Sequence, residues 1–145
     1  MITQNFFCRG AFLTVLLLML PTVGFACRCP GSISPIAAYK QADIVLWGKV
    51  MAVKGDINKE GATARISVSK VWKKKIQNEV SVLTATTCAF EFQLNEEYLL
   101  YLYESSDGKY YTTKKCVGNL PISQAEKALD WLKRHGMPMD IDYKP

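Results

Sequence analysis

The sequence predicts a mainly β domain that closes into a small barrel of five strands and ends in an amphipathic helix. Three features support this prediction. Apolar and polar residues alternate in several short segments, polar turns separate those segments, and a helical period occurs over 121–135. With 145 residues, of which 49% are hydrophobic, the chain is long and apolar enough for one packed core.

The expected strands differ in how much of each face is apolar. The segment 43–54 is apolar on both faces, which is typical of a central strand, and Gly48 allows it to bend. The segment 62–72 alternates as a half-buried strand does. The other three strands are marked by Val80 with Val82, by 98–103 and by 110–113. Strands of this number and curvature favour the five-stranded barrel of oligonucleotide- and oligosaccharide-binding (OB) proteins.

Polar turns are expected between these strands. The loops 55–61 and 105–108 are typical of hairpin connections, and the lysine run 73–75 is expected to be a solvated turn. Between the third and fourth strands, 90–94 alternates again, and Asn95 suits a left-handed turn. A formal charge of +5 with one dense basic run does not indicate a nucleic-acid partner.

A helix is expected over 121–135. Ser123 and Glu126 have the spacing of a capping box at its start, cations lie in its last turn, and Gly136 can close its end. One face of the helix carries an apolar stripe of Ala125, Ala128, Leu129 and Leu132. The tail 137–145 is expected to fray.

Residues 1–26 have the pattern of an export signal. The apolar run 11–20 is too short to span a bilayer, and Gly24 and Ala26 are small residues at a cleavage site. Cleavage there leaves a domain at 27–136, beginning with Cys27, and no membrane span. The protein is therefore expected to be exported, either secreted or periplasmic, and monomeric. An uncleaved anchor and a lipoprotein linked at Cys27 are the alternatives.

Four cysteines remain after cleavage, and in an exported chain they are expected to form two disulfides. A bond between Cys27 and Cys29 is disfavoured, because so small a ring strains the disulfide geometry, so each is expected to pair with Cys88 or Cys116. Both of the resulting pairings stay open on the residues alone. The spacing does not resemble the paired C-x-x-C of zinc ribbons, which makes a four-cysteine zinc site the weaker alternative.

The sequence after residue 26 does not offer the arrangement of residues that common catalytic sites need. His135, the chain's one histidine, is expected at a helix end, so no catalytic triad can be built around it. Asp43 and Glu97 are isolated carboxylates, which does not favour a two-carboxylate hydrolase. The aromatic segment 98–103 suits core packing better than base stacking. We therefore expect no enzymatic activity, no catalytic residues and no cofactor.

The amino terminus has a chemistry of its own. A free α-amine has a pKa near 7.7–8, so part of it is neutral and can donate a lone pair to a metal at neutral pH. The amine and the carbonyl oxygen of Cys27 can together form a five-membered chelate ring. Catalytic zinc sites keep one position open, occupied by water, which such a chelate can displace.

The pattern of these residues resembles the inhibitory domain of the tissue inhibitors of metalloproteinases (TIMPs) and the related netrin-type modules. The order and spacing of the cysteines are the most specific part, and the likeness spans most of 27–135. The motifs are Cys27-x-Cys29, Ala38-Tyr39-x-x-Ala42-Asp43-Ile44-Val45, Gly48-Lys49-Val50, Val71-Trp72-Lys73, Cys88-x-Phe90, Tyr98-Leu99-Leu100-Tyr101 and Cys116.

The resemblance implies a fold, a disulfide pairing and an activity. The fold is the five-stranded OB barrel with flanking helices, and the pairing is Cys27–Cys88 with Cys29–Cys116. The activity is inhibition of a zinc metalloprotease, whose zinc the amine and carbonyl of Cys27 chelate. Arg28 then points into the specificity pocket of the protease. The implied contact residues are Cys27, Arg28, Cys29, Pro30, Thr86, Thr87, Cys88 and Ala89.

The chain also departs from the family pattern. Pro30 directly follows Cys29, whereas family members place a proline one residue later, and Arg28 replaces a small polar residue. Lys40 stands where the first cysteine of a third bridge is expected, and the second, cysteine-rich domain is missing. A non-inhibitory module that binds a protein or glycan, and a purely structural domain, are the competing hypotheses.

Overall fold

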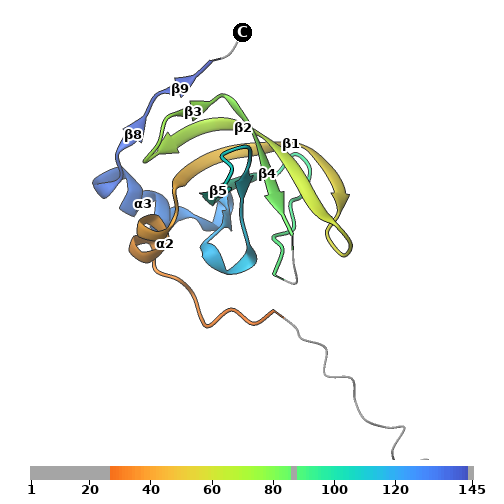
Figure 1. The fold of residues 1–145 in the computed structure, drawn as a ribbon. Helices are drawn as coiled ribbons and strands as arrows, with labels where there is room; N and C mark the ends of the chain where they lie inside the picture. The colour runs from red at the N-terminus through yellow and green to blue at the C-terminus, as the bar shows by residue number, and fades with distance from the viewer. Residues whose placement is uncertain (1–26, 86–87, 144–145) are drawn as a thin grey trace, which may run out of the picture.

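The structure is a computed structural model of the 145-residue chain, and it describes residues 27–85 and 88–143. Figure 1 shows a strongly curved sheet, with helices α2 and α3 packed side by side at one end. The elements in chain order are α2 (Pro35–Gln41), β1 (Ile44–Asp56), β2 (Gly61–Trp72), β3 (Ile76–Gln77), β4 (Glu79–Thr84), β5 (Glu97–Glu104), β6 (Tyr111–Thr112), η1 (Lys115–Val117), β7 (Leu120–Pro121), η2 (Ile122–Gln124), α3 (Glu126–His135), β8 (Pro138–Met139) and β9 (Ile141–Asp142).

Five strands close the barrel. They follow the order β1-β2-β4-β6-β5, and β5 pairs back onto β1. Neighbouring strands are antiparallel, except that β4 and β6 run parallel. The predicted fold class, a closed five-stranded barrel of the OB type followed by a helix, is confirmed. The expected third and fifth strands correspond to β4 and β6.

The first strand is the central one, as its two apolar faces predict. β1 pairs with β2 over most of its length and with β5 through its first half. Register shifts after Trp47 and after Val50 interrupt the β1–β2 ladder, and bulges of this kind bend a strand. A Cβ atom on Gly48 would lie 2.5 Å from Cγ2 of Ile66, so the close approach of β1 and β2 requires glycine there.

Two apolar cores lie on opposite sides of the barrel wall. The interior core is filled mainly by alternate side chains of the strands, namely Ile44, Leu46, Val50, Ala64, Ile66, Val68, Val71, Val80, Val82, Tyr98, Leu100 and Leu102, with Ile76. The second core lies between the barrel and the helices and contains Ala38, Ala42, Val45, Trp72, Leu99, Tyr101, Ala125, Ala128 and Leu132. Both faces of β5 and of the first half of β1 are therefore buried, one in each core.

The lysine run is not a simple solvated turn, in contrast to the sequence expectation. Lys73 has a left-handed backbone (φ 77°), and its amine donates to the carbonyl oxygens of Tyr39 and Ala42 at the end of α2. Lys74 pairs with Glu104, whose hydrogen bond raises the Lys74 pKa, and Lys75 pairs with Asp142. The run thus connects β2 to α2, β5 and β9.

The start of the second helix also differs from the prediction. α3 begins at Glu126, its N-cap residue is Ala125, and no side chain caps it, so the Ser123–Glu126 capping box does not form. Ser123 instead lies in the short helix η2, which occupies the preceding turn. Gly136 ends α3 with an extended backbone, and a Cβ there would lie 2.7 Å from the ring of Trp72.

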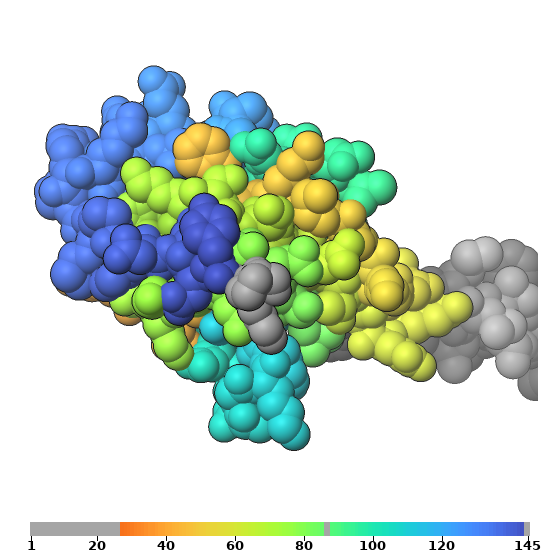
Figure 2. Space-filling view, turned by 90° about the horizontal axis from the view of Figure 1, so that it is seen from above, coloured from red at the N-terminus to blue at the C-terminus, as the bar shows by residue number. Residues whose placement is uncertain are grey.

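The tail does not fray as expected. β8 pairs with β2, β9 pairs in parallel with β3, and the backbone N–H of Asn78 donates to the carbonyl oxygen of Asp142. Figure 2 shows the carboxyl-terminal residues, in dark blue, lying over the green strands. Two-residue strands such as these have too little periodicity for sequence to predict. Lys144 and Pro145 lie outside the described residues.

The segment between β4 and β5 is irregular, although 90–94 alternates like a strand. Phe90 and Phe92 pack edge-on against each other and against Tyr98, while Leu94 is exposed. The predicted turn at Asn95 is confirmed by its left-handed backbone, with φ of 65°. The aromatic side chains therefore attach this segment to the barrel core without a ladder of backbone hydrogen bonds.

Within the described residues, no helix is long and apolar enough to cross a membrane.

Candidate functional site

The segment from Cys27 to α2 lies outside the regular structure, alongside the barrel. Arg28, Cys29 and Pro30 are exposed, and Cys27 is half-buried. In Figure 1 this segment, in orange, runs from α2 beneath the barrel towards the loop that follows β4. The proposed leader, 1–26, lies outside the described residues, so the cleavage site stays a sequence prediction.

Two disulfides hold this segment. Cys27 is bonded to Cys88 and Cys29 to Cys116, with Cα–Cα distances of 5.2 Å and 5.3 Å, which is the pairing that the resemblance implies. They close loops over 61 and 87 residues of sequence separation. Disulfide bonds of this kind are compatible with export to an oxidising compartment. Because the four sulfurs are in disulfides, they do not form the four-thiolate zinc site considered as an alternative.

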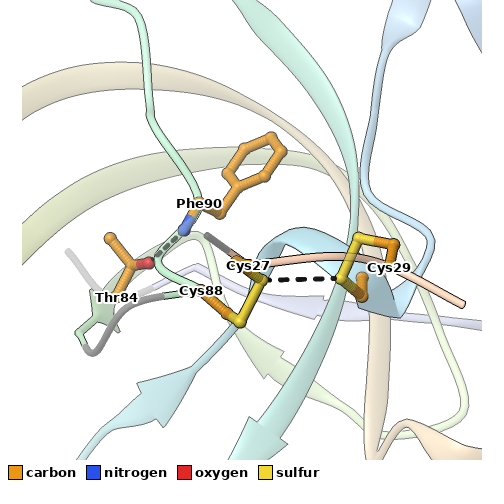
Figure 3. Close-up of a disulfide and its surroundings, with 6 residues drawn as sticks. Cys27, Cys29, Thr84, Cys88 and Phe90 are labelled. Carbon is orange, nitrogen blue, oxygen red and sulfur yellow. Dashed lines mark hydrogen bonds between the residues drawn. A yellow bond between two sulfur atoms is a disulfide. The ribbon is translucent and has the colours of Figure 1, made fainter. Parts of the chain in front are cut away.

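The two disulfides lie side by side. Figure 3 shows Cys27, Cys29 and Cys88 close together, and the distance between Sγ of Cys27 and Sγ of Cys116 is 3.9 Å. Their anchor points come from different parts of the barrel, since Cys88 follows β4 and Cys116 lies in η1 after β6. The backbone N–H of Lys115 donates to the carbonyl oxygen of Cys88 and joins the two anchor points directly.

Polar contacts fix the anchor at Cys88. The backbone N–H of Phe90 donates to Oγ1 of Thr84, 2.6 Å away (Figure 3), and the Thr84 side chain is fully buried. The Phe90 ring then packs onto Tyr98. Ala89 is 4% exposed, so its side chain is buried beside the Cys88 anchor. Its place among the implied contact residues stays a prediction.

A buried polar network fixes the anchor at Cys116. Asn119 accepts through Oδ1 from the backbone N–H of Tyr101, and donates through Nδ2 to Oγ1 of Thr113 and to the carbonyl oxygen of Lys114. The hydroxyl of Thr113 in turn donates to the carbonyl oxygen of Tyr101. These bonds hold the loop that carries Cys116 against β5.

Sequence reasoning missed Asn119, Thr113 and Thr84, because isolated polar residues carry no periodic signal. The pair Gly118-Asn119 indicates a turn, and Gly118 does adopt a left-handed backbone, with φ of 104°. A Cβ on Gly118 would lie 3.0 Å from Cβ of Ala38 and 3.1 Å from Cγ2 of Ile33. Gly118 thus lets the terminal segment and α2 approach the Cys116 loop closely.

The structure brings together most of the implied site. Cys27 is bonded to Cys88 and Cys29 to Cys116, whereas Thr86 and Thr87 fall outside the described residues. Arg28 makes no ion pair or hydrogen bond with the described residues. Exposed lysines at 114 and 115 flank the Cys116 anchor, so the region around the terminus is cationic.

The two isolated carboxylates do not form a pair. Asp43 accepts from the backbone N–H of Glu104 at the end of β5, and Glu97 accepts from the indole N–H of Trp47 at its start. Seven residues of extended strand separate these positions by about 23 Å. A two-carboxylate hydrolase needs its carboxyl groups within about 10 Å, so this arrangement does not serve that chemistry.

The remaining candidates have structural roles. Tyr98 and Tyr101 are 4% and 1% exposed, so the aromatic strand packs in the cores and offers no stacking platform at these positions. His135 lies at the end of α3, stacks on Trp131 and contacts the carbonyl oxygen of that residue through Nδ1. No group of three or more His, Cys, Asp or Glu side chains within 27–85 and 88–143 is arranged to hold a metal ion.

A comparison with protein-family models finds no match, and a comparison with curated protein sequences finds none either.

Proposed function

We propose that the mature protein blocks a zinc metalloendopeptidase with its amino terminus, as the resemblance to the TIMP inhibitory domain implies. One observation supports this proposal above the others. The first and third residues after the predicted cleavage site are bridged to different parts of the fold, one to the segment after β4 and the other to η1. Because the terminus is held at two points that are two residues apart, it loses little conformational entropy when it binds a partner.

The chemistry follows from the free α-amine of Cys27. The neutral amine and the carbonyl oxygen of Cys27 bind the zinc of the protease and displace its water. The zinc belongs to the partner, so the inhibitor needs no metal of its own. Loss of that water removes the nucleophile that the protease needs for peptide hydrolysis.

The disulfides lower the cost of this binding. An extended peptide of three or four residues loses about 0.5–1.5 kcal/mol for each side chain that binding immobilises, besides the cost of ordering its backbone. In this chain, folding has already ordered the backbone on either side of Arg28. The terminus and the segment at Cys88 then form one continuous edge that enters the active-site cleft of the protease.

Arg28 determines which protease is blocked. Its side chain is exposed between the two bridged cysteines, without an ion pair in the described part of the chain. A guanidinium group binds carboxylates well, whereas its burial in an apolar pocket without a partner is costly. The proposed target is therefore an endopeptidase with an acidic specificity pocket, in keeping with the lysines around the Cys116 anchor.

The test compares two forms of the purified exported protein on a panel of zinc endopeptidases. One form begins at Cys27, and the other carries one additional alanine before it. We expect inhibition by the first form and loss of inhibition by the second, because the extra residue converts the amine into an amide that cannot donate its lone pair. Terminal sequencing and intact mass establish which form is present. Equal inhibition by both forms contradicts the chelation mechanism.

A second candidate function uses a different surface. A groove of about 480 Å³ lies between β4 and the β5–β6 hairpin, which protrudes in cyan in Figure 2. Its lining includes Lys75, Lys109 and Tyr110, of which Tyr110 is 41% exposed. This groove supports the alternative hypothesis that the protein is a module that binds a protein or glycan through its barrel. Binding that survives acetylation of the amino terminus supports this candidate over the inhibitor.

A further inference from the structure

The sulfur atoms of the two disulfides form a compact cluster at the amino terminus. The Sγ atoms of Cys27 and Cys116 belong to different disulfides and lie 3.9 Å apart, close to van der Waals contact. Cys27 is half-buried and Cys29 is exposed, so small thiols in solvent have access to the cluster. Disulfide exchange requires a thiolate to approach the sulfur that it attacks, and this pair already meets that condition.

We infer that the cluster is a thiol–disulfide exchange site, through which a dithiol reductant moves the bridge of Cys27 from Cys88 to Cys116. The reductant first opens the Cys27–Cys88 bond, leaves two thiols and is itself oxidised to a disulfide. The Cys27 thiol then loses its proton to solvent, and the thiolate attacks Sγ of Cys116. The Cys27–Cys116 bond forms, the Cys29–Cys116 bond breaks, and Cys29 leaves as a thiolate that takes up a proton.

The same product is reached when the other bridge is opened first. Reduction of Cys29–Cys116 leaves a Cys116 thiolate 3.9 Å from Sγ of Cys27. Attack on that sulfur forms Cys27–Cys116 and releases Cys88 as a thiolate. Loss of either native bridge therefore leads to one common species, in which Cys27 is bonded to Cys116 and the thiols of Cys29 and Cys88 are reduced.

The exchange takes place within one chain, so it is faster than disulfide exchange between chains. Groups held together in one fold have an effective concentration of about a millimolar or more. At about 1 µM protein, exchange within the chain is therefore favoured about a thousandfold over exchange between chains. The attacking species is the thiolate, so the exchange proceeds faster at pH 8 than at pH 6.

The exchange changes the anchor of the first mature residue. In the native pairing Cys27 is held beside the segment that follows β4, and after exchange it is held to η1. Cys29 is then released altogether, so the backbone around Arg28 is tethered at one point. If the proposed function is correct, on which this consequence rests, a reducing environment switches off the inhibitor while one bridge persists.

The test uses the folded wild-type protein and maps its disulfides. The protein is exposed briefly to a limiting amount of dithiothreitol at pH 8, its thiols are blocked with N-ethylmaleimide, and it is digested with trypsin. Trypsin cleaves after Arg28 and after Lys115, so Cys27, Cys29 and Cys116 fall in separate peptides, and Cys88 lies in the peptide 76–109. We expect a Cys27–Cys116 linked peptide, formed at a rate that does not depend on protein concentration.

Single serine variants define the mechanism. Cys88→Ser and Cys29→Ser each remove one native bridge and keep the two close sulfurs, and both are expected to contain the Cys27–Cys116 bond. The controls Cys27→Ser and Cys116→Ser each remove one of the close sulfurs and are expected to keep the remaining native bridge. Circular dichroism checks that each variant is folded.

Two results overturn the inference. The first is a partly reduced wild-type protein that contains native bridges and free thiols without the Cys27–Cys116 peptide. The second is non-native disulfide pairing in the control variants as extensive as in Cys88→Ser and Cys29→Ser. That result would show that exchange comes from general mobility of the chain and not from the 3.9 Å contact. Both results are read from disulfide-linked peptides and require no assay of a target protease. They therefore test the exchange whether or not the protein is an inhibitor.

Discussion

The amine of Lys73 donates a hydrogen bond to the carbonyl oxygen of Tyr39, 2.8 Å away, at the end of helix α2. The same amine donates to Ala42 and lies 5.1 Å from the centre of the Tyr39 ring. A single cation after β2 thus binds carbonyl groups that a seven-residue helix leaves unsatisfied. Because α2 follows the bridged terminus in the chain, this contact helps to hold the segment that carries the proposed site.

Replacement of Lys73 by alanine is expected to destabilise the fold. Hydrogen bonds that involve a charged group contribute about 1.5–3 kcal/mol when partly buried, so we expect the free energy of unfolding to fall by about 2 kcal/mol. Urea denaturation measures this change. Lys59→Ala is the matched control, because Lys59 is 79% exposed and pairs with Asp56 in a surface hairpin. The control is expected to lose less than about 1 kcal/mol. Equal effects of both substitutions contradict the capping role.

Substitution of Asn119 is expected to lower the free energy of unfolding more than substitution of most other polar residues. Asn119→Ala leaves the buried backbone N–H of Tyr101 and the partly buried carbonyl oxygen of Lys114 without their partner. We expect a loss of about 3 kcal/mol, because each unsatisfied buried group costs about 1–3 kcal/mol. Asn58→Ala, in the exposed β1–β2 turn, is the control and is expected to change stability by less than about 0.5 kcal/mol. Thermal denaturation that gives similar losses for both variants argues against the network.

Stability is expected to fall at alkaline pH because of Tyr101. Burial raises the pKa of Tyr101 to about 12, from an ordinary value near 10. Below pH 10 its hydroxyl is neutral in both states, so its stabilising contribution is fully present. Between pH 10 and 12 the unfolded chain ionises while the folded chain holds the proton, and that contribution is lost. At pH 11 the loss is about 1 kcal/mol.

Urea unfolding at pH 9 and pH 11 measures this effect. Tyr101→Phe keeps the ring and removes the ionisable group, so it is expected to reduce the loss of stability between these two pH values. Burial also raises the pKa values of Tyr103 and Tyr111, which produce a residual loss in the same direction. Tyr143→Phe alters a side chain that is 77% exposed and is expected to behave as wild type. An unchanged pH dependence in Tyr101→Phe excludes this assignment.

Arg28 is expected to control affinity for the target under the proposed function. For a protease that the wild-type protein inhibits, Arg28→Glu is expected to raise the inhibition constant by at least about tenfold, because a carboxylate repels an acidic pocket and this corresponds to about 1.4 kcal/mol. Wild-type inhibition is also expected to weaken as salt screens the charges. Arg65→Glu on β2 is the control for charge reversal. Unchanged inhibition by Arg28→Glu contradicts an acidic pocket.

Much of the barrel was predictable from local pattern. The double apolar faces of β1, its bend at Gly48 and the left-handed turn at Asn95 all follow from side-chain period and backbone preference. The capping box at Ser123 and the frayed tail were wrong predictions, since a short helix and two-residue strands there depend on neighbours far away in sequence.

The sequence by itself determined where the longer strands β1, β2, β4 and β5 lie, the two apolar faces in the first half of β1 and the cysteines available to hold the terminus, because each rests on residue type and short-range period. Only the tertiary structure decided that Lys73 caps α2, that Asn119 holds the Cys116 loop and that the sulfurs of Cys27 and Cys116 lie 3.9 Å apart. These contacts join residues 18 to 89 positions apart. Closure of the barrel brings them together, and no local pattern encodes that proximity.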